Sequence, residues 1–251
     1  MNKGVWLALV LCGLTVRASE QDLRVAAASD LQAALPAIAA QFEKATGHHV
    51  VLTFGSSGNF ATQIENGAPF DVFMSADIEY PRRLEASGVA VRGSLYEYAT
   101  GRLVLWARKD SGVDLGRGVA VLADANVTRI AIANPTHAPY GRAAVAAMRH
   151  EGLYDRVQSK LVLGENISQT AQFAESGNAT VGLIALALAL GPAMKDAGTY
   201  AEIPTTFYPP IEQAAVVIRA SKQKAVAAEY IEALKGQAAR AMLQSFGFGV
   251  R

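Results

Sequence analysis

The sequence contains almost no cysteine, and this scarcity excludes several kinds of site. Cys12 is the single cysteine among 251 residues, and it lies in an apolar stretch near the N-terminus. A disulfide framework needs paired cysteines, and a thiolate metal site needs several of them at ligand spacing. The fold must therefore rest on its hydrophobic core, and no metal ligands and no cofactor are predicted.

A strong charge of one sign is also lacking. The formal net charge is +1, and Lys and Arg are scattered without a basic stripe, which disfavours a nucleic-acid partner. The sequence shows no nucleophile elbow, phosphate-binding loop or metal-binding helix motif. The longest apolar run in the body of the chain, Val181 to Leu190, is about half the length of a membrane span. We therefore expect a soluble protein that is not an enzyme.

The N-terminus has the features of a secretory signal peptide. Lys3 supplies a positive charge, and the apolar stretch from Val5 to Val16 is too short to span a membrane. Val16-Arg17-Ala18 then resembles a cleavage site of the A-x-A kind. This pattern predicts a signal peptide over residues 1–18 and a periplasmic mature protein. Cys12 follows the bulky Leu11 instead of a small residue, so a lipid anchor on Cys12 is not expected.

Strand-like runs alternate with helical patterns along the rest of the chain, an order typical of an α/β fold with mainly parallel sheets. The predicted strands are 23–28, 50–54, 71–75, 102–107, 129–133, 160–163, 180–184 and 214–219. The predicted helices are 31–46, 59–65, 78–87, 141–151, 168–176, a segment from 185 to about 197, 223–235 and 237–246. Two lobes with a cleft between them are the economical arrangement. Lobe I is predicted to comprise residues 19–100 and 212–251, and lobe II residues 101–211.

Four strand-to-helix junctions consist largely of small, hydroxyl and glycine residues. They are AASDL (27–31), FGSSGNF (54–60), HAPYGRA (137–143) and GENISQT (164–170). A helix N-terminus has unpaired backbone N–H groups and a partial positive charge, so it is a natural anion site. These loops would lie outside the carboxyl ends of the strands, where ligands gather in doubly wound sheets.

Ordinary capping explains each junction taken singly, because Ser, Asn and Gly are the residues that helix starts prefer. Ser29 and Gln32, for example, have the spacing of a capping box. The four junctions taken together are more informative than any one of them. Two lie in each predicted lobe of an exported chain without a catalytic constellation. Together the junctions favour a dianion held by neutral donors.

The same loops carry a resemblance to a known family. The segments VAAASDLQAALPAIAAQFEKATGHHV and VLTFGSSGNFATQIENGAPFDVFMSAD resemble the first strand, helix and Ser-rich loop of the periplasmic molybdate-binding proteins of ABC transporters. IAIANPTHAPYGRAA resembles a motif of that family's second lobe, and EYIEALKGQAARAMLQSFGFGV resembles its closing helices. The resemblance extends from about Leu23 to Arg251 and is most specific in the Ser-rich loop.

The resemblance implies a type II periplasmic binding protein, in which two α/β lobes joined by crossing strands close on a ligand. It implies that Ser29 and Ser57 of lobe I contact the ligand through hydroxyl and backbone N–H groups. Tyr140 and Ile167 of lobe II would contact it through their backbone N–H groups. The implied ligand is molybdate, with tungstate bound similarly. A monomer would deliver it to an inner-membrane ABC permease.

One position departs from the pattern of the family. Some members use a Tyr hydroxyl where Ala185 stands, and alanine has no hydroxyl to donate. A receptor for a different oxyanion, or for a small organic anion, is therefore an alternative.

A secreted serine hydrolase is the alternative from another class. Ser57 would then need a His within hydrogen-bonding reach, and His137 is the one arguable candidate. Asp71 and Asp77 flank a predicted strand without an evident base partner, and both are interpreted as caps or rim charges.

Overall fold

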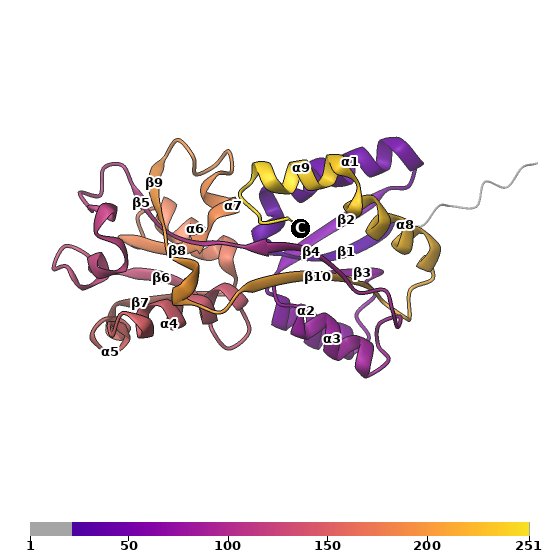
Figure 1. Ribbon diagram of the computed structural model, residues 1–251, viewed down its shortest axis with the longest axis horizontal. Helices are drawn as coiled ribbons and strands as arrows, with labels where there is room; N and C mark the ends of the chain where they lie inside the picture. Colours follow the sequence, from indigo (N-terminus) through magenta and orange to yellow (C-terminus); the bar gives the residue numbers. More distant parts are fainter. Residues whose placement is uncertain (1–21, 251) are drawn as a thin grey trace, which may run out of the picture.

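The computed structural model describes residues 22–250, which fold into two α/β lobes (Figure 1). The predicted signal peptide at residues 1–18, Cys12 included, lies outside the described residues. Within residues 22–250, no helix has the length and apolar character needed to cross a membrane.

Lobe I is built on a five-stranded sheet of order β2-β1-β3-β10-β4. Its strands are β1 (Leu23–Ala28), β2 (Val50–Gly55), β3 (Val72–Ser75), β4 (Tyr96–Gly101) and β10 (Ile211–Val217). Its helical segments are η1 (Ser29–Ala33, a 3-10 turn), α1 (Leu35–Thr46), α2 (Ser57–Glu65), α3 (Glu79–Ala86), α8 (Lys224–Lys235) and α9 (Gln237–Ser245). In Figure 1, α2 and α3 cover one face of this sheet, and α1, α8 and α9 cover the other.

Lobe II is built on a second five-stranded sheet, of order β7-β6-β8-β5-β9. Its strands are β5 (Leu103–Arg108), β6 (Ile130–Ala133), β7 (Leu161–Gly164), β8 (Val181–Ala185) and β9 (Gly198–Glu202). Its helices are α4 (Pro139–His150), α5 (Tyr154–Val157), α6 (Ile167–Glu175) and α7 (Leu186–Ala189). Three 3-10 segments complete it: η2 (Leu115–Ala123), η3 (Gln158–Lys160) and η4 (Thr205–Phe207).

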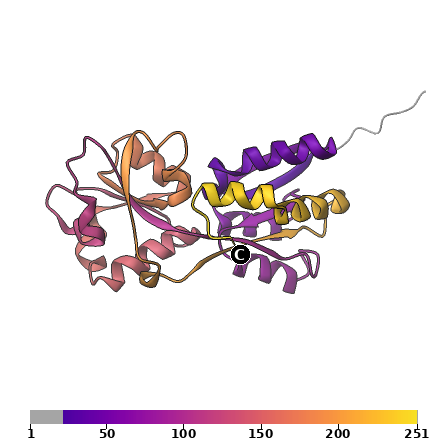
Figure 2. The same cartoon turned by 45° about the horizontal axis from the view of Figure 1, so that its top comes forward.

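Two chain segments cross between the lobes. Strand β4 ends at Gly101 in the first sheet and β5 begins at Leu103 in the second; the return runs from β9 through residues 203–210 to β10. Figures 1 and 2 show both segments passing between the lobes, with the C-terminal end of the chain beside them. The end of the chain is held there because Thr100 and Gly249 exchange backbone hydrogen bonds of 2.7 and 2.9 Å. The residue boundaries predicted for the lobes stay a prediction.

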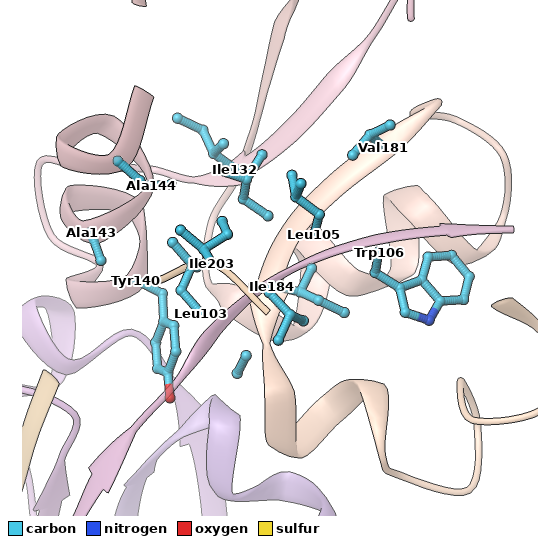
Figure 3. Packing of buried hydrophobic residues seen from close by; sticks show 14 of the residues in the cluster. Leu103, Leu105, Trp106, Ile132, Tyr140, Ala143, Ala144, Val181, Ile184 and Ile203 are labelled. Carbon is cyan, nitrogen blue, oxygen red and sulfur yellow. The ribbon is translucent and has the colours of Figure 1, made fainter. Parts of the chain in front are cut away.

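Each lobe has its own apolar core. In lobe II, Leu105, Trp106 and Ile184 pack with residues of β6 and α4 (Figure 3). In lobe I, separate clusters fill the two faces of the sheet. Strand β1 is buried at nearly every position, because helices cover both faces of its sheet. This double coverage explains why LRVAAA reads as a short apolar run and not as an alternating strand.

The structure corrects the prediction of mainly parallel sheets. In lobe I, β1 is parallel to β2 and β3, but β10 is antiparallel to β3 and β4. In lobe II, β6 is parallel to β7 and β8, but β5 is antiparallel to β8 and β9. The antiparallel pairs arise because β5 and β10 enter their sheets from the opposite lobe.

Two predicted helices differ in extent from the structure, and two strands are additional to the prediction. The helix predicted over 31–46 is divided into η1 and α1, with Pro36 in the first turn of α1, where proline is tolerated. The helix predicted to reach about 197 ends at Ala189, shortly before the breakers Gly191 and Pro192. Strands β4 and β9 were not predicted.

Candidate functional site

One small cavity between the lobes collects all the ligand contacts predicted from sequence. Its volume is about 10 Å³, and its lining includes Ser29, Ser57, Tyr140 and Ile167. These residues are between 1 and 4% exposed. The other residues of the lining are Ala28, Asp30, Gly55, Ser56, Ala76, Ala138 and Pro139. The structure therefore brings together residues that are up to 138 positions apart in the chain (167 − 29).

The fold places these residues together because each follows the carboxyl end of a parallel strand. Ser29 follows β1, Ser57 follows β2, and the starts of α4 and α6 follow β6 and β7. Parallel strands in one sheet end at the same edge, and here the two such edges face each other across the cleft.

Backbone N–H groups at three helix starts are available to a ligand. The first N–H groups of a helix have no partner within the helix. Among the backbone hydrogen bonds of residues 22–250, none is donated by the N–H groups of Ser57, Tyr140 or Ile167. These are the first residues of α2 and α6 and the second of α4. Three helix N-termini therefore present free donors to one cavity, an arrangement that suits an anion.

The two predicted serine hydroxyls are oriented as donors. Ser57 Oγ accepts a hydrogen bond of 3.0 Å from the Ala76 N–H, and Ser29 Oγ accepts one of 3.4 Å from the Ser168 N–H. A serine hydroxyl has a single proton to donate. Because these oxygens are already used as acceptors, the proton of each is left for an acceptor in the cavity.

Side-chain capping explains only one of these junctions. Asn166 caps α6 by accepting from the Gln169 N–H at 3.0 Å, whereas α2, α4 and η1 have no side-chain cap. The capping box predicted for Ser29 and Gln32 is wrong, because Gln32 Oε1 instead accepts from Ser168 Oγ across the cleft at 2.6 Å. The serine hydroxyls at the uncapped junctions are therefore free to serve a purpose other than helix capping.

His137 and Ser56 join the lobes beside the cavity. Ser56 Oγ donates to the His137 carbonyl at 2.7 Å, and the Gly58 N–H donates to the same oxygen at 3.0 Å. His137 Nδ1 lies 2.9 Å from Ser56 Oγ. A Cβ on Gly58 would stand 2.6 Å from that carbonyl oxygen, so the close approach of the lobes depends on glycine at this position.

Asp30, which the sequence analysis did not single out, is fully buried in the wall of the cavity. Its Oδ2 accepts from the Tyr140 hydroxyl at 2.9 Å and from Gln213 Nε2 at 2.5 Å. Gln213 in turn accepts from the Tyr98 hydroxyl at 2.9 Å. Figure 3 shows the Tyr140 side chain leaving α4 and pointing away from the apolar cluster of lobe II. We call Asp30, Tyr140 and Gln213 the hinge socket.

Burial dominates the electrostatics of the hinge socket. It raises the pKa of Asp30 to about 6, against the opposing effect of the hydrogen bonds from Gln213 and Tyr140. Burial, followed by the nearby Asp30 charge, raises the pKa of both Tyr98 and Tyr140 well above the ordinary value. No Lys, Arg or His is among the described residues that line the cavity. Its donors are therefore neutral.

Three further residues singled out from sequence lie elsewhere. Ala185 is fully buried opposite Leu103 in the β5–β8 pair and is not among the residues that line the cavity. Asp77 accepts from the Glu79 N–H at 2.9 Å just before α3 and pairs with Arg142 of lobe II. It is therefore a charge at the rim of the cleft, whereas the N-cap residue of α3 is Ile78.

Asp71 is neither a helix cap nor a rim charge. It is 8% exposed and accepts from the Arg24 N–H at 2.8 Å and from Ser221 Oγ at 2.6 Å. It lines a larger hollow of about 540 Å³ at the amino ends of β1 and β3. This hollow is remote from the helix starts, and the carboxylate in its wall is already satisfied within lobe I.

Two α/β lobes joined by crossing segments, with a small cavity between them at the carboxyl ends of their strands, define a type II periplasmic binding protein. The family model for bacterial extracellular solute-binding proteins matches residues 23–249. The chain belongs to that family.

Known relatives make the comparison more specific. The chain is 40% identical over 238 residues to a molybdate-binding protein of Azotobacter vinelandii, covering 95% of this chain and 94% of the relative. It is 39% identical over 242 residues to a molybdate-binding protein of Rhodobacter capsulatus, covering 96% and 93%. The solved structure of the Azotobacter vinelandii periplasmic molybdate-binding protein matches with a TM-score of 0.86 at 38% identity, covering 92% of this chain and 100% of that one. The resemblance predicted from the Ser-rich loop is confirmed.

Proposed function

We propose that this protein captures molybdate, and tungstate in the same way, and delivers it to an ABC permease. The observation that carries the proposal is the convergence of three unpaired backbone N–H groups, on Ser57, Tyr140 and Ile167, at one closed cavity. The hydroxyls of Ser29 and Ser57 add two neutral donors. A set of neutral donors pointing inward from several directions matches a tetrahedral dianion, whose charge is spread over four oxygens.

The size of the cavity supports a small inorganic anion over an organic one. About 10 Å³ is the order of space that one buried water occupies. A tetrahedral oxyanion therefore needs the lobes to separate slightly, and an organic anion would need them to stand much farther apart. Molybdate and tungstate have nearly the same size and charge, and we expect similar affinities for them. Sulfate is smaller and would be bound less well. A protonated phosphate would also need an acceptor in the site.

We further propose that the chain is a carrier and not an enzyme. The hydrolase alternative requires a base beside Ser57, but His137 contacts the neighbouring Ser56. Ser57 Oγ is held instead by the Ala76 backbone. A monomer located in the periplasm completes the proposal, with the exposed surfaces of both lobes available to the permease.

Titration of the purified protein with molybdate, tungstate, sulfate and phosphate tests the proposal, with intrinsic fluorescence and melting temperature as readouts. We expect saturation by molybdate and tungstate well below the millimolar range. No response to molybdate below that range would refute the proposed ligand, and a stronger response to sulfate would identify a different oxyanion.

Ser57→Ala tests the site itself. It removes one hydrogen bond to a charged ligand, worth about 1.5–3 kcal/mol, so the affinity should fall about 10- to 100-fold. Ser87→Ala is the matched control, because Ser87 lies in the same lobe and bonds only to the Leu84 carbonyl at the end of α3. It should leave the affinity unchanged.

A further inference from the structure

Asp30 is an unusual group to find in the wall of an anion site. It is the one carboxylic acid among the described residues that line the cavity, and its exposed fraction is 0%. Oδ2 receives both hydrogen bonds of the hinge socket, while Oδ1 is buried without a hydrogen-bond partner among the described residues. An ionised carboxylate with one unsatisfied oxygen is costly to bury. A proton on Oδ1 removes that charge.

The groups around Asp30 provide no compensating positive charge. The titratable side chains that face it are the phenols of Tyr98 on β4 and Tyr140 on α4, and the third neighbour, Gln213 on β10, is neutral. Glu97 and Glu212 are next to Tyr98 and Gln213 in their strands. Both are acidic and partly exposed, so neither supplies a positive charge.

The remaining elements packed against η1 are equally poor in charge near Asp30. Strand β2 and helix α7 contain no ionisable residue. Arg24 is near the beginning of β1 and Glu175 ends α6, whereas Asp30 lies past the end of β1 and faces the start of α6. In α1, the charged residues Glu43 and Lys44 are in the last turn. Among residues 22–250, no Lys, Arg or His therefore lines the cavity beside Asp30 or donates one of its side-chain hydrogen bonds.

Closure of the lobes is what seals this carboxylate. Asp30 belongs to lobe I, Tyr140 to lobe II, and Gln213 to the crossing strand β10. The Tyr140 phenol lies against Gly101, where a Cβ would stand 2.2 Å from its oxygen. Separation of the lobes withdraws the phenol from the hinge socket and admits water to Asp30. The same residue, Tyr140, faces the ligand cavity with its free N–H and seals Asp30 with its hydroxyl.

We propose that Asp30 couples anion capture to the uptake of one proton: the lobes close on the dianion, the Tyr140 phenol seals the carboxylate, and Asp30 enters the closed complex as the neutral acid. The proton passes from solvent to Asp30 and returns to solvent when the lobes open. This inference rests on the proposed function, because it requires a negatively charged ligand beside Asp30. A like charge nearby disfavours ionisation in the same direction as burial does.

The direction of the pH effect follows from linkage. Burial, against the opposing hydrogen bonds from Gln213, Tyr140 and the backbone N–H groups of Asp30 and Leu31, raises the pKa of Asp30 from 3.8 to about 6, and the bound dianion raises it further. The closed complex therefore holds more protons than the open protein, so closure is favoured at low pH and the affinity falls as pH rises. The affinity begins to fall near the pKa that Asp30 has in the open protein, and it levels off above the pKa that Asp30 has in the closed complex. The fall approaches tenfold per pH unit where a full proton is taken up.

Isothermal titration calorimetry with molybdate measures the proton directly. Titrations at about pH 6.5, in buffers that differ in ionisation enthalpy, give the number of protons taken up per anion bound. We expect a value between a half and one for the wild-type protein, together with a falling affinity between about pH 5 and pH 8. Free molybdate is a dianion at about pH 6.5, so any proton in the complex is taken up on binding, and the Asp30→Asn variant assigns it to the protein or to the ligand.

Asp30→Asn separates the charge from the hydrogen bonds. Both socket hydrogen bonds go to one carboxylate oxygen, and an amide oxygen can accept both. We expect this variant to bind molybdate without proton uptake, with an affinity independent of pH and tighter than that of the wild type at about pH 8. Asp71→Asn is the matched control: it alters a buried carboxylate of the same lobe that lies outside the cavity, and it should keep the proton uptake of the wild type.

The outcomes distinguish the two proposals. Molybdate binding by the wild type without proton uptake overturns the role of Asp30 and leaves the proposed function intact, and this result needs no variant to fold. Proton uptake that persists in Asp30→Asn but disappears in His137→Gln would assign the proton to the histidine at the cleft and also overturn the inference. Failure to bind molybdate at all refutes the proposed function instead.

Discussion

Two sets of contacts join the lobes, and they differ in their exposure to water. The hinge socket of Asp30, Tyr140 and Gln213 is buried, with each residue 2% exposed or less. The outer contacts are the pairs Asn59–Glu165, Asp77–Arg142 and Gln32–Ser168, which include side chains up to 60% exposed. Both sets consist of polar side chains that meet across the same cleft.

The difference shows that contacts of similar geometry contribute unequally to the free energy of lobe closure. A hydrogen bond in a low-dielectric interior is strengthened, and its loss leaves buried groups unsatisfied. An exposed ion pair is screened and contributes about 0–1 kcal/mol. We therefore expect the closed state to depend on the hinge socket, and the outer contacts to contribute alignment more than free energy.

The largest effect is expected from Asp30→Ala, which removes the acceptor of the hinge socket. The Tyr140 hydroxyl and the Gln213 amide would both lose a buried partner, at about 1–3 kcal/mol each. The molybdate affinity should fall about 100-fold or more, measured by calorimetry. Small-angle scattering should show an expanded protein at a molybdate concentration that compacts the wild type. An affinity within threefold of the wild type would show that the hinge socket does not hold the lobes closed.

Gly58→Ala should be nearly as damaging, because it leaves the side chains of both contact sets in place but pushes the lobes apart. Its Cβ would meet the His137 carbonyl oxygen at 2.6 Å and the Tyr80 hydroxyl at 2.8 Å. Overpacking of this kind costs about 1–3 kcal/mol, so the affinity should fall about 10- to 100-fold. The clash with the His137 backbone forms only on closure, and the Tyr80 hydroxyl of the same lobe is the far end of a side chain that can move aside. The melting temperature without ligand should therefore stay close to that of the wild type. A large drop in that temperature would place the strain within lobe I instead.

Tyr140→Phe should have a smaller effect, about tenfold in affinity. It removes the 2.9 Å hydrogen bond to Asp30 and a longer one of 3.3 Å from Gln213, and it keeps the backbone N–H. Tyr230→Phe is the matched control. Tyr230, on α8 of lobe I, is buried like Tyr140, but its hydroxyl has no hydrogen-bond partner among the described residues. Loss of this unsatisfied hydroxyl should leave the affinity unchanged and the melting temperature equal or higher. Equal affinities for the two variants would remove Tyr140 from the closure mechanism.

The smallest effect is expected from the outer contacts. Arg142→Ala breaks the pair with Asp77, whose side chains are 40% and 25% exposed. The loss should not exceed about 1 kcal/mol, or about fivefold in affinity, and it should shrink further at high salt. If Arg142→Ala lost as much molybdate affinity as Tyr140→Phe at high salt, the two sets of contacts would contribute equally to closure, against the expectation.

Much of the site could be predicted because local sequence and strand order are closely linked. The residues after β1, β2, β6 and β7 are those that free helix N-termini require, and parallel strands bring such residues to one edge. Ser29, Ser57, Tyr140 and Ile167 were named on the resemblance at these loops, and the structure places all of them around one cavity. Strand β9 could not be found in this way, because GTYAE is an exposed edge strand with a buried first residue and carries little apolar signal.

Asp30 shows what the sequence concealed. In AASDL it has the appearance of an ordinary acidic residue at a helix start, where a carboxylate suits the helix dipole. Its partners, Tyr140 and Gln213, are 110 and 183 positions away in the sequence, and its burial depends on them. No local pattern reports such contacts. A buried acid beside an anion cavity can be recognised only when the three segments are seen together.

The sequence by itself determined the α/β alternation, the helix-start loops and the membership in a family of solute-binding proteins, because these depend on local periodicity, turn chemistry and short motifs. The tertiary structure alone decided that Ser29 and Ser57 line the cavity without capping a helix, where the antiparallel crossing strands enter the sheets, and that Asp30 is sealed by a tyrosine of the opposite lobe. Those features depend on which polar groups lose contact with water when two distant parts of the chain meet, and that is settled only by the closed arrangement of the lobes.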